Sequence, residues 1–150
     1  EVMAVIELEV KVLVQNEGGG FTILLTDKEE RYVLPIVIGP TEAYSIALPL
    51  QGSSYPRPLT HDLMLALCGQ LGLSLKEVVI TDVRENTFYA EVRFLKDGEE
   101  IVLDSRPSDA IALAVRAGAP IYMTNRLLEF TLNFHDITFK GDESGSQGLH

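Results

Sequence analysis

An internal repeat constrains the fold of this chain more than any other feature of its sequence. Residues 21–48 align without a gap on residues 88–115, and the hydrophobic pattern agrees along the alignment. The identical positions pair Phe21 with Phe88, Pro40 with Pro107, Ala43 with Ala110 and Ala47 with Ala114. A pattern that persists over this length predicts two copies of one structural unit, at about residues 6–72 and 73–139.

Each copy is expected to run β-β-β-α-α. In the first, apolar and polar residues alternate over 6–14 in the period-two pattern of a strand with one solvent-exposed face, and glycines 18–20 are expected to form a turn. Strands near 21–26 and 31–38 follow. In the second copy the matching strands lie near 77–84, 87–95 and 99–104, with Asp97-Gly98 as a hairpin turn.

The helices of each copy begin with a proline, a hydroxyl residue and an acid: Pro40-Thr41-Glu42 and Pro107-Ser108-Asp109. Proline suits the first helical turn, and an acid there complements the helix dipole. We therefore expect a helix from Pro107 to Ala117. A second helix is expected in each copy, capped by Thr60 and by Thr124, the first of them running over 61–71.

These elements predict a single α+β domain over residues 1–140, with a largely antiparallel or mixed sheet packed with helices. Residues 141–150 are rich in Gly and Ser and are expected to form a flexible acidic tail. Cys68 is the single cysteine, expected in the core, and a cytoplasmic, reducing compartment fits this usage. No apolar stretch is long enough to span a membrane, and the N-terminus carries no export signal pattern.

Charge restricts the partners that such a domain can bind. The chain has 22 acidic and 12 basic residues, a net charge of −10. This field disfavours tight, sequence-independent binding of nucleic acid unless several cations gather on one face. Walker, nucleophile-elbow, His-Glu-x-x-His and CxxC motifs are absent from the sequence.

Positions where only one copy is polar are the best candidates for function. Asp104, Ser105 and Arg106 fall on the apolar Val37, Ile38 and Gly39 of the first copy. An acid, a hydroxyl and a guanidinium before a helix start suit a phosphate or a metal-bound phosphodiester. The alternative is a buried Asp104–Arg106 network that only fixes the turn.

A second asymmetric cluster is the segment 57–62, Arg-Pro-Leu-Thr-His-Asp. The helix dipole would favour the neutral form of His61 in the first turn, which suits a general base. The alternative is a packing or surface histidine. Asp62, like Glu42 and Asp109, is also explained by pairing with the positive end of the dipole.

The segments 57–63, 103–114 and 34–39 resemble the bifunctional nuclease family. That resemblance implies a small domain, found in bacteria and in plant nuclear proteins, that degrades both DNA and RNA. The residues that match the family motifs are Arg57, His61, Asp62, Asp104, Arg106, Ser108 and Asp109.

Our first hypothesis is a nuclease that hydrolyses phosphodiester bonds of DNA or RNA. It assigns catalysis to His61, Asp62, Asp104 and Asp109, with a divalent cation such as Mg²⁺ as a candidate cofactor, and substrate binding to Arg57, Ser105, Arg106 and Ser108. The second hypothesis is a non-catalytic oligomeric module that binds a small anionic ligand or a partner protein through the same groove. A third is a purely structural assembly unit. A homodimer is the default expectation.

Overall fold

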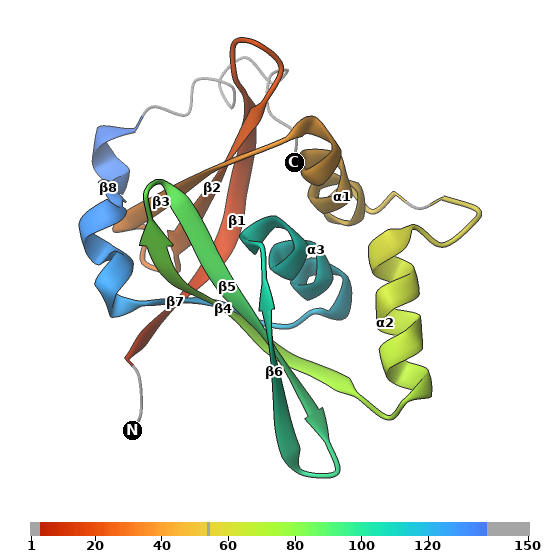
Figure 1. Cartoon of the computed structure of the whole chain (residues 1–150). Coiled ribbons are helices and arrows are strands. Elements are labelled where there is room, and N and C mark those ends of the chain that lie inside the picture. The colour runs from red at the N-terminus through yellow and green to blue at the C-terminus, as the bar shows by residue number, and fades with distance from the viewer. Residues whose placement is uncertain (1–3, 54, 138–150) are drawn as a thin grey trace.

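The computed structural model describes residues 4–53 and 55–137. In this part of the chain, eight strands form one sheet in the order β6-β5-β4-β7-β1-β2-β3-β8, with helices packed against it (Figure 1). The predicted single α+β domain is confirmed. In chain order the elements are β1 (Val5–Gln15), β2 (Phe21–Asp27), β3 (Tyr32–Ile38), α1 (Pro40–Leu50), α2 (Thr60–Gln70), β4 (Ser74–Arg84), β5 (Thr87–Lys96), β6 (Glu99–Ser105), α3 (Pro107–Ala117), β7 (Ile121–Thr124), the 3-10 helix η1 (Asn125–Phe130), β8 (Leu132–Asn133) and the 3-10 helix η2 (Phe134–Asp136).

Two antiparallel meanders, β1-β2-β3 and β4-β5-β6, form the two sides of the sheet. Their hairpins turn where the sequence predicts: Gly18 and Gly19 have positive φ, and so do Asp97 and Gly98. β7 joins the meanders, because it pairs antiparallel with β1 and parallel with β4. The sheet is therefore continuous across the molecule.

The core lies between the sheet and helices α1 and α3. α3 is the most deeply placed helix, with every residue from Ala110 to Ala114 buried. It packs against α1, α2, β4 and β5. α2 lies further out, and His61 is the buried residue in it among those that the structure describes. Cys68 of α2 is partly exposed and packs against the rim of the core, so its predicted core position is wrong.

The two halves keep the same element order through their first helix and then differ. The helix expected from Thr124 is present as the 3-10 helix η1 instead of an α-helix, and the strand β7, which the sequence did not predict, precedes it. Ile121 and Met123 of β7 are buried at the centre of the sheet, which favours an extended strand there. Thr124 precedes η1 without capping it, because its hydroxyl donates to the carbonyl of Thr81.

The predicted cap of α2 is also corrected. Thr60 is the first residue of the helix and Leu59 is the N-cap, whose N–H donates to Asp62 Oδ2 at 2.9 Å. The duplication itself stays a prediction, and the expected tail at 141–150 lies outside the described residues. Across residues 4–53 and 55–137, no helix has both the length and the apolar character that crossing a membrane requires.

Candidate functional site

A cleft of about 860 Å³ opens where the starts of α1, α2 and α3 meet the β5-β6 hairpin, and we call it the first cleft. Its floor is apolar and includes Val92, Phe94, Ile101, Leu103 and Leu113. Its polar end carries Glu42, His61, Asp104, Ser105, Arg106 and Asp109. The fold therefore brings five of the eight predicted site residues to one place, and Glu42 lies there as well.

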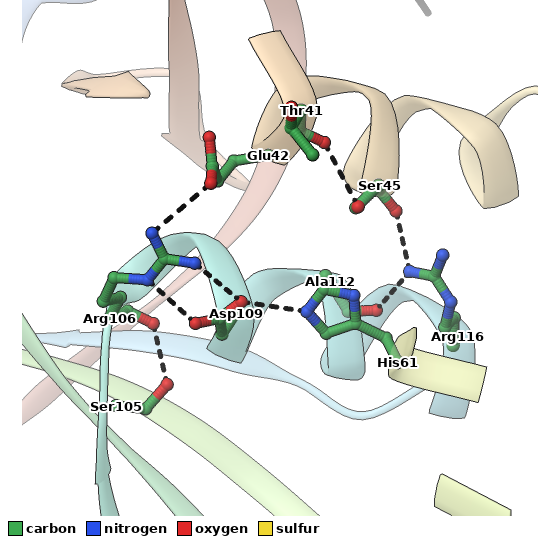
Figure 2. Close-up of polar contacts among 9 residues, drawn as sticks. All are labelled: Thr41, Glu42, Ser45, His61, Ser105, Arg106, Asp109, Ala112 and Arg116. Atoms are coloured by element: carbon green, nitrogen blue, oxygen red, sulfur yellow. Dashed lines mark hydrogen bonds and ion pairs between the residues drawn. The ribbon is translucent and has the colours of Figure 1, made fainter. Parts of the chain in front are cut away.

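Asp109 is the centre of this polar end (Figure 2). Its Oδ1 lies 2.9 Å from His61 Nε2, and its Oδ2 accepts a hydrogen bond of 2.9 Å from Arg106 Nε. Arg106 Nη2 also donates to Oδ1, at 3.2 Å. Burial tends to raise the pKa of Asp109, but the hydrogen bonds from Arg106 and His61 outweigh it and hold the pKa below its ordinary value. Asp109 is therefore an ionised carboxylate at neutral pH.

The ionised state of Asp109 determines the form of His61. A carboxylate accepts hydrogen bonds, so His61 Nε2 carries a proton and donates it to Asp109. In the neutral imidazole the other nitrogen, Nδ1, then keeps its lone pair. His61 is 8% exposed and comes from α2, whereas Asp109 comes from α3, so the pair forms only in the folded chain.

Arg106 links the two helix starts. It is the N-cap of α3, and its guanidinium also lies near the α1 residue Glu42, with Nη1 3.4 Å from Oε2. The predicted Asp104–Arg106 network is wrong, because Arg106 pairs with Asp109 and Glu42 instead. Asp104 is exposed on β6 and lines the first cleft, and its carboxylate forms no hydrogen bond with the residues that the structure describes.

Three of the eight predicted site residues lie outside the first cleft, and two of them, Asp62 and Arg57, lie near Arg116. Asp62 accepts from the backbone N–H of Leu59 and from Arg116 Nε, at 2.9 Å in each case. These hydrogen bonds, Leu59 first, lower the pKa of Asp62. Arg57 lines a separate hollow beside Asp62 and Arg116, so neither Arg57 nor Asp62 lines the first cleft.

Arg116 is the important residue that sequence reasoning missed. Its side chain is 7% exposed, and besides Asp62 it donates to the carbonyls of Ser45 and Ala112 at 2.7 and 2.9 Å (Figure 2). It thereby ties α2 and α1 to the end of α3. In the sequence it looks like an ordinary basic residue in the last helical turn.

The two predicted serines lie on different sides of Arg106. Ser105 lines the first cleft, and its hydroxyl donates to the carbonyl of Arg106 at 2.8 Å. Ser108 lines a second cleft of about 610 Å³, bordered by the end of β3, the β4-β5 hairpin, the start of α3 and η1. Arg106 and Glu42 line both clefts and form the wall between them.

The arrangement does not fit the predicted divalent cation. Both carboxylate oxygens of Asp109 are engaged by His61 and Arg106, and Glu42 faces the same guanidinium. Within the described residues, no three His, Cys, Asp or Glu side chains are grouped as metal ligands. We therefore derive no chemical step through a metal at this site.

Known proteins resemble this chain over most of its length. The family model for the bifunctional nuclease domain matches residues 23–133. An uncharacterized protein of Mycobacterium tuberculosis (strain ATCC 25618 / H37Rv) is 48% identical over 106 residues, which cover 71% of this chain and 63% of that protein.

Plant relatives carry the family name. Bifunctional nuclease 1 of Oryza sativa subsp. japonica is 30% identical over 98 residues, and bifunctional nuclease 2 of Arabidopsis thaliana is 26% identical over 98 residues. Each match covers 63% of this chain and 30% of the plant protein. The chain thus spans less than two thirds of the length of these relatives.

Proposed function

The chain belongs to the bifunctional nuclease family, and on that premise we propose that it hydrolyses phosphodiester bonds of DNA or RNA in the first cleft. The observation that carries the proposal is the hydrogen bond between His61 Nε2 and Asp109 Oδ1 at the polar end of that cleft. A carboxylate that fixes one nitrogen of an imidazole makes the other nitrogen available as a general base.

The proposed reaction begins with His61 Nδ1 taking a proton from the attacking oxygen, which is a water or, in RNA, a ribose 2′-hydroxyl. That oxygen bonds to phosphorus while the bond to the leaving oxygen breaks. The imidazolium, stabilised by ionised Asp109, then returns the proton to the leaving oxygen. This sequence requires Nδ1 to face the substrate phosphate.

Arg106 is the proposed phosphate ligand in the first cleft. Its guanidinium is largely exposed, and its contact with Glu42 at 3.4 Å is the longest of its ion pairs. A phosphate oxygen would replace Glu42 there and leave the shorter pair with Asp109 intact. Because two carboxylates already neutralise Arg106 and the chain carries a net charge of −10, we expect weak, salt-sensitive binding.

The test is cleavage of labelled single-stranded RNA and DNA by the purified chain, with EDTA in one arm and Mg²⁺ in another. We expect His61→Asn to lower the rate by about 10²- to 10⁴-fold, the range for loss of a general base. His135→Asn is the matched control, because His135 is exposed on η2. Equal cutting by wild type and His61→Asn would overturn the assignment of His61 as the general base.

The apolar floor of the first cleft favours a second candidate, a non-catalytic module that binds a small ligand with an anionic and an apolar part. Five apolar side chains line the floor, and the single guanidinium is already paired. This function predicts a thermal shift with nucleotides or phosphate esters but no turnover. If no nucleotide or phosphate ester changes the melting temperature, this second candidate function is refuted.

A second copy of the chain is the protein partner that we propose. Leu63 and Leu67 are exposed on α2 and Leu71 at its C-cap, and Val102 and Leu103 are exposed on β6, which is an edge strand in the described sheet. Exposed apolar edge strands are normally covered, and an antiparallel β6-β6 pair would be self-complementary. Sedimentation of wild type and Val102→Glu tests this, with Leu132→Glu as control. A wild type that stays monomeric at high concentration refutes it.

A cytoplasmic location remains part of the proposal. It rests on Cys68, which has no second cysteine in the chain to pair with.

A further inference from the structure

We infer that the second cleft binds one nucleotide of a single-stranded nucleic acid, with the phosphate at the start of α3 and the base against Phe88 and Phe130. This inference rests on the proposed function, because it adds a subsite to the same binding groove. Three observations support it: the carboxylate of Asp109 is turned away from the backbone N–H groups at the start of α3, the Ser108 hydroxyl has no partner among the described residues, and aromatic side chains line the cleft.

The starts of α1 and α3 differ in whether a carboxylate covers them. Both helices begin with proline, and neither has a side-chain cap. The carboxylate of Glu42 turns back over Gly39 so closely that a Cβ on Gly39 would collide with it. Asp109, the corresponding acid of α3, is turned to His61 and Arg106 instead. The carboxylate of Asp109 therefore lies in the first turn of α3 but is bonded to side chains and not to the backbone N–H groups of the helix start.

Ser108 gives an independent indication of a ligand. The residue is 7% exposed and lines the second cleft, and its hydroxyl forms no hydrogen bond with the described residues. The oxygen is nevertheless not sealed from solvent, so it belongs to the small exposed part of the residue. Nearly buried hydroxyls usually have a partner, and an oxygen of a bound phosphate would supply one.

Arg106 places a positive charge beside the same helix start. A guanidinium at an N-cap lies at the positive end of the helix dipole, where acids are favoured. An anion in the second cleft would offset the positive end of the dipole, and Arg106, which lines that cleft as well, would contact it in place of Glu42. The backbone N–H groups of Ser108 and Asp109, the Ser108 hydroxyl and Arg106 together match the donors of a phosphate site at a helix start.

The other side of the second cleft suits a nucleobase. Phe88 and Phe130 line it, and Phe130 is 46% exposed. Bases of single strands stack on such aromatic side chains, whereas bases in a duplex are already stacked. Because Arg106 and Glu42 separate the two clefts, a strand held here would carry its neighbouring phosphate toward His61.

The test follows amide signals of the ¹⁵N-labelled full chain in NMR while adenosine monophosphate or inorganic phosphate is added. Adenosine monophosphate has no phosphodiester bond, so binding is measured without cleavage. We expect the amides of Ser108 and Asp109 to shift with both ligands, and to shift more than the amide of Thr41 at the α1 start, which does not line the second cleft. Shifts spread evenly over exposed cations, or none at Ser108 and Asp109, would overturn the inference.

Two variants separate the base from the phosphate. Phe130→Ala is expected to weaken adenosine monophosphate binding about tenfold and leave inorganic phosphate binding unchanged. Leu132→Ala is the matched control, because Leu132 is similarly exposed but lines neither cleft. Ser108→Ala should weaken both ligands. Equal binding of adenosine monophosphate by wild type and Phe130→Ala overturns the base site.

The outcome is distinguishable from that of the proposed function. Cleavage of RNA or DNA that needs His61, with no amide shift at Ser108, removes the subsite and leaves the nuclease. Amide shifts that need Phe130, with no cleavage by the wild type, keep a nucleotide site and remove the nuclease.

Discussion

The starts of α1 and α3 carry the same local signal and serve different purposes. Each presents a proline, a hydroxyl residue and an acid. Glu42 folds back over its own helix start, while Asp109 turns outward to His61 and Arg106. The same capping pattern therefore stabilises a helix in one half of the molecule and builds a candidate site in the other.

The difference arises from what lies beside each helix start. Position 39 is a glycine without a side chain, whereas Arg106 places a guanidinium within reach of its own acid. α2 packs against α3 and supplies His61, but the second half continues into β7 and η1 where the first has α2. One residue and one neighbouring helix are enough to redirect a carboxylate.

The largest expected effect is on the rate of phosphodiester hydrolysis, when Asp109 and Glu42 are neutralised one at a time. Asp109→Asn should lower phosphodiester hydrolysis by about 10³-fold or more, because an amide neither fixes the reactive form of His61 nor stabilises the imidazolium. Glu42→Gln should change the rate less than about fivefold, because Glu42 touches only Arg106 in the site. Steady-state rates on one labelled RNA compare the two variants. Equal losses would mean that the two helix starts are equivalent after all.

The next largest effect is on the free energy of unfolding, when Arg116, whose hydrogen bonds join α2 to α3, is replaced. Arg116→Leu should lower the free energy of unfolding by about 2–4 kcal/mol, because it removes a buried cation and leaves Asp62 and two carbonyls without their donor. Arg84→Leu is the control, since Arg84 Nε also lies 2.9 Å from an aspartate but its side chain is mostly exposed. We expect a clearly smaller loss there, because water screens an exposed ion pair. Urea unfolding measures both, and equal values would refute a special role for Arg116.

Much of the fold was predictable because its signals are local. α3 begins and ends where proline and Gly118 indicated, and Gly118 has the positive φ of a helix C-terminus. The strands follow from alternation and from the turn glycines. β7 was not predictable, because it is defined by pairing with β1 and β4, both distant in sequence. Its four residues are too few to show the alternation by which the longer strands were recognised.

The site was predictable in part for the same reason. Comparing the copies singled out Asp104, Ser105 and Arg106, and all three line the first cleft. The segment 57–62 was misleading, because neighbouring residues of a helix point in different directions. His61 therefore faces Asp109 while Asp62 faces Arg116.

A smaller effect is expected from making the α1 start resemble that of α3. Gly39 has a φ of −78°, which alanine adopts freely, so Gly39→Ala acts by displacing the flexible end of Glu42. The cost should stay under about 1 kcal/mol. The amides of Thr41 and Glu42 should then respond to inorganic phosphate in NMR. Gly69→Ala, where an added Cβ meets nothing, is the control, and unchanged amides in Gly39→Ala would show that the carboxylate does not close the α1 start.

The smallest expected effect is a pH dependence of stability that belongs to α3. The pKa of Asp109 is lower in the folded chain than its ordinary value of 3.8, because its hydrogen bonds to Arg106 and His61 outweigh burial. Its contribution to stability is therefore complete above that ordinary value and is lost as pH falls through the folded pKa. Asp109→Asn should flatten the acid limb of urea unfolding free energies measured between about pH 5 and pH 2. An identical limb in wild type and Asp109→Asn would show that the turned-out carboxylate of α3 contributes nothing to stability.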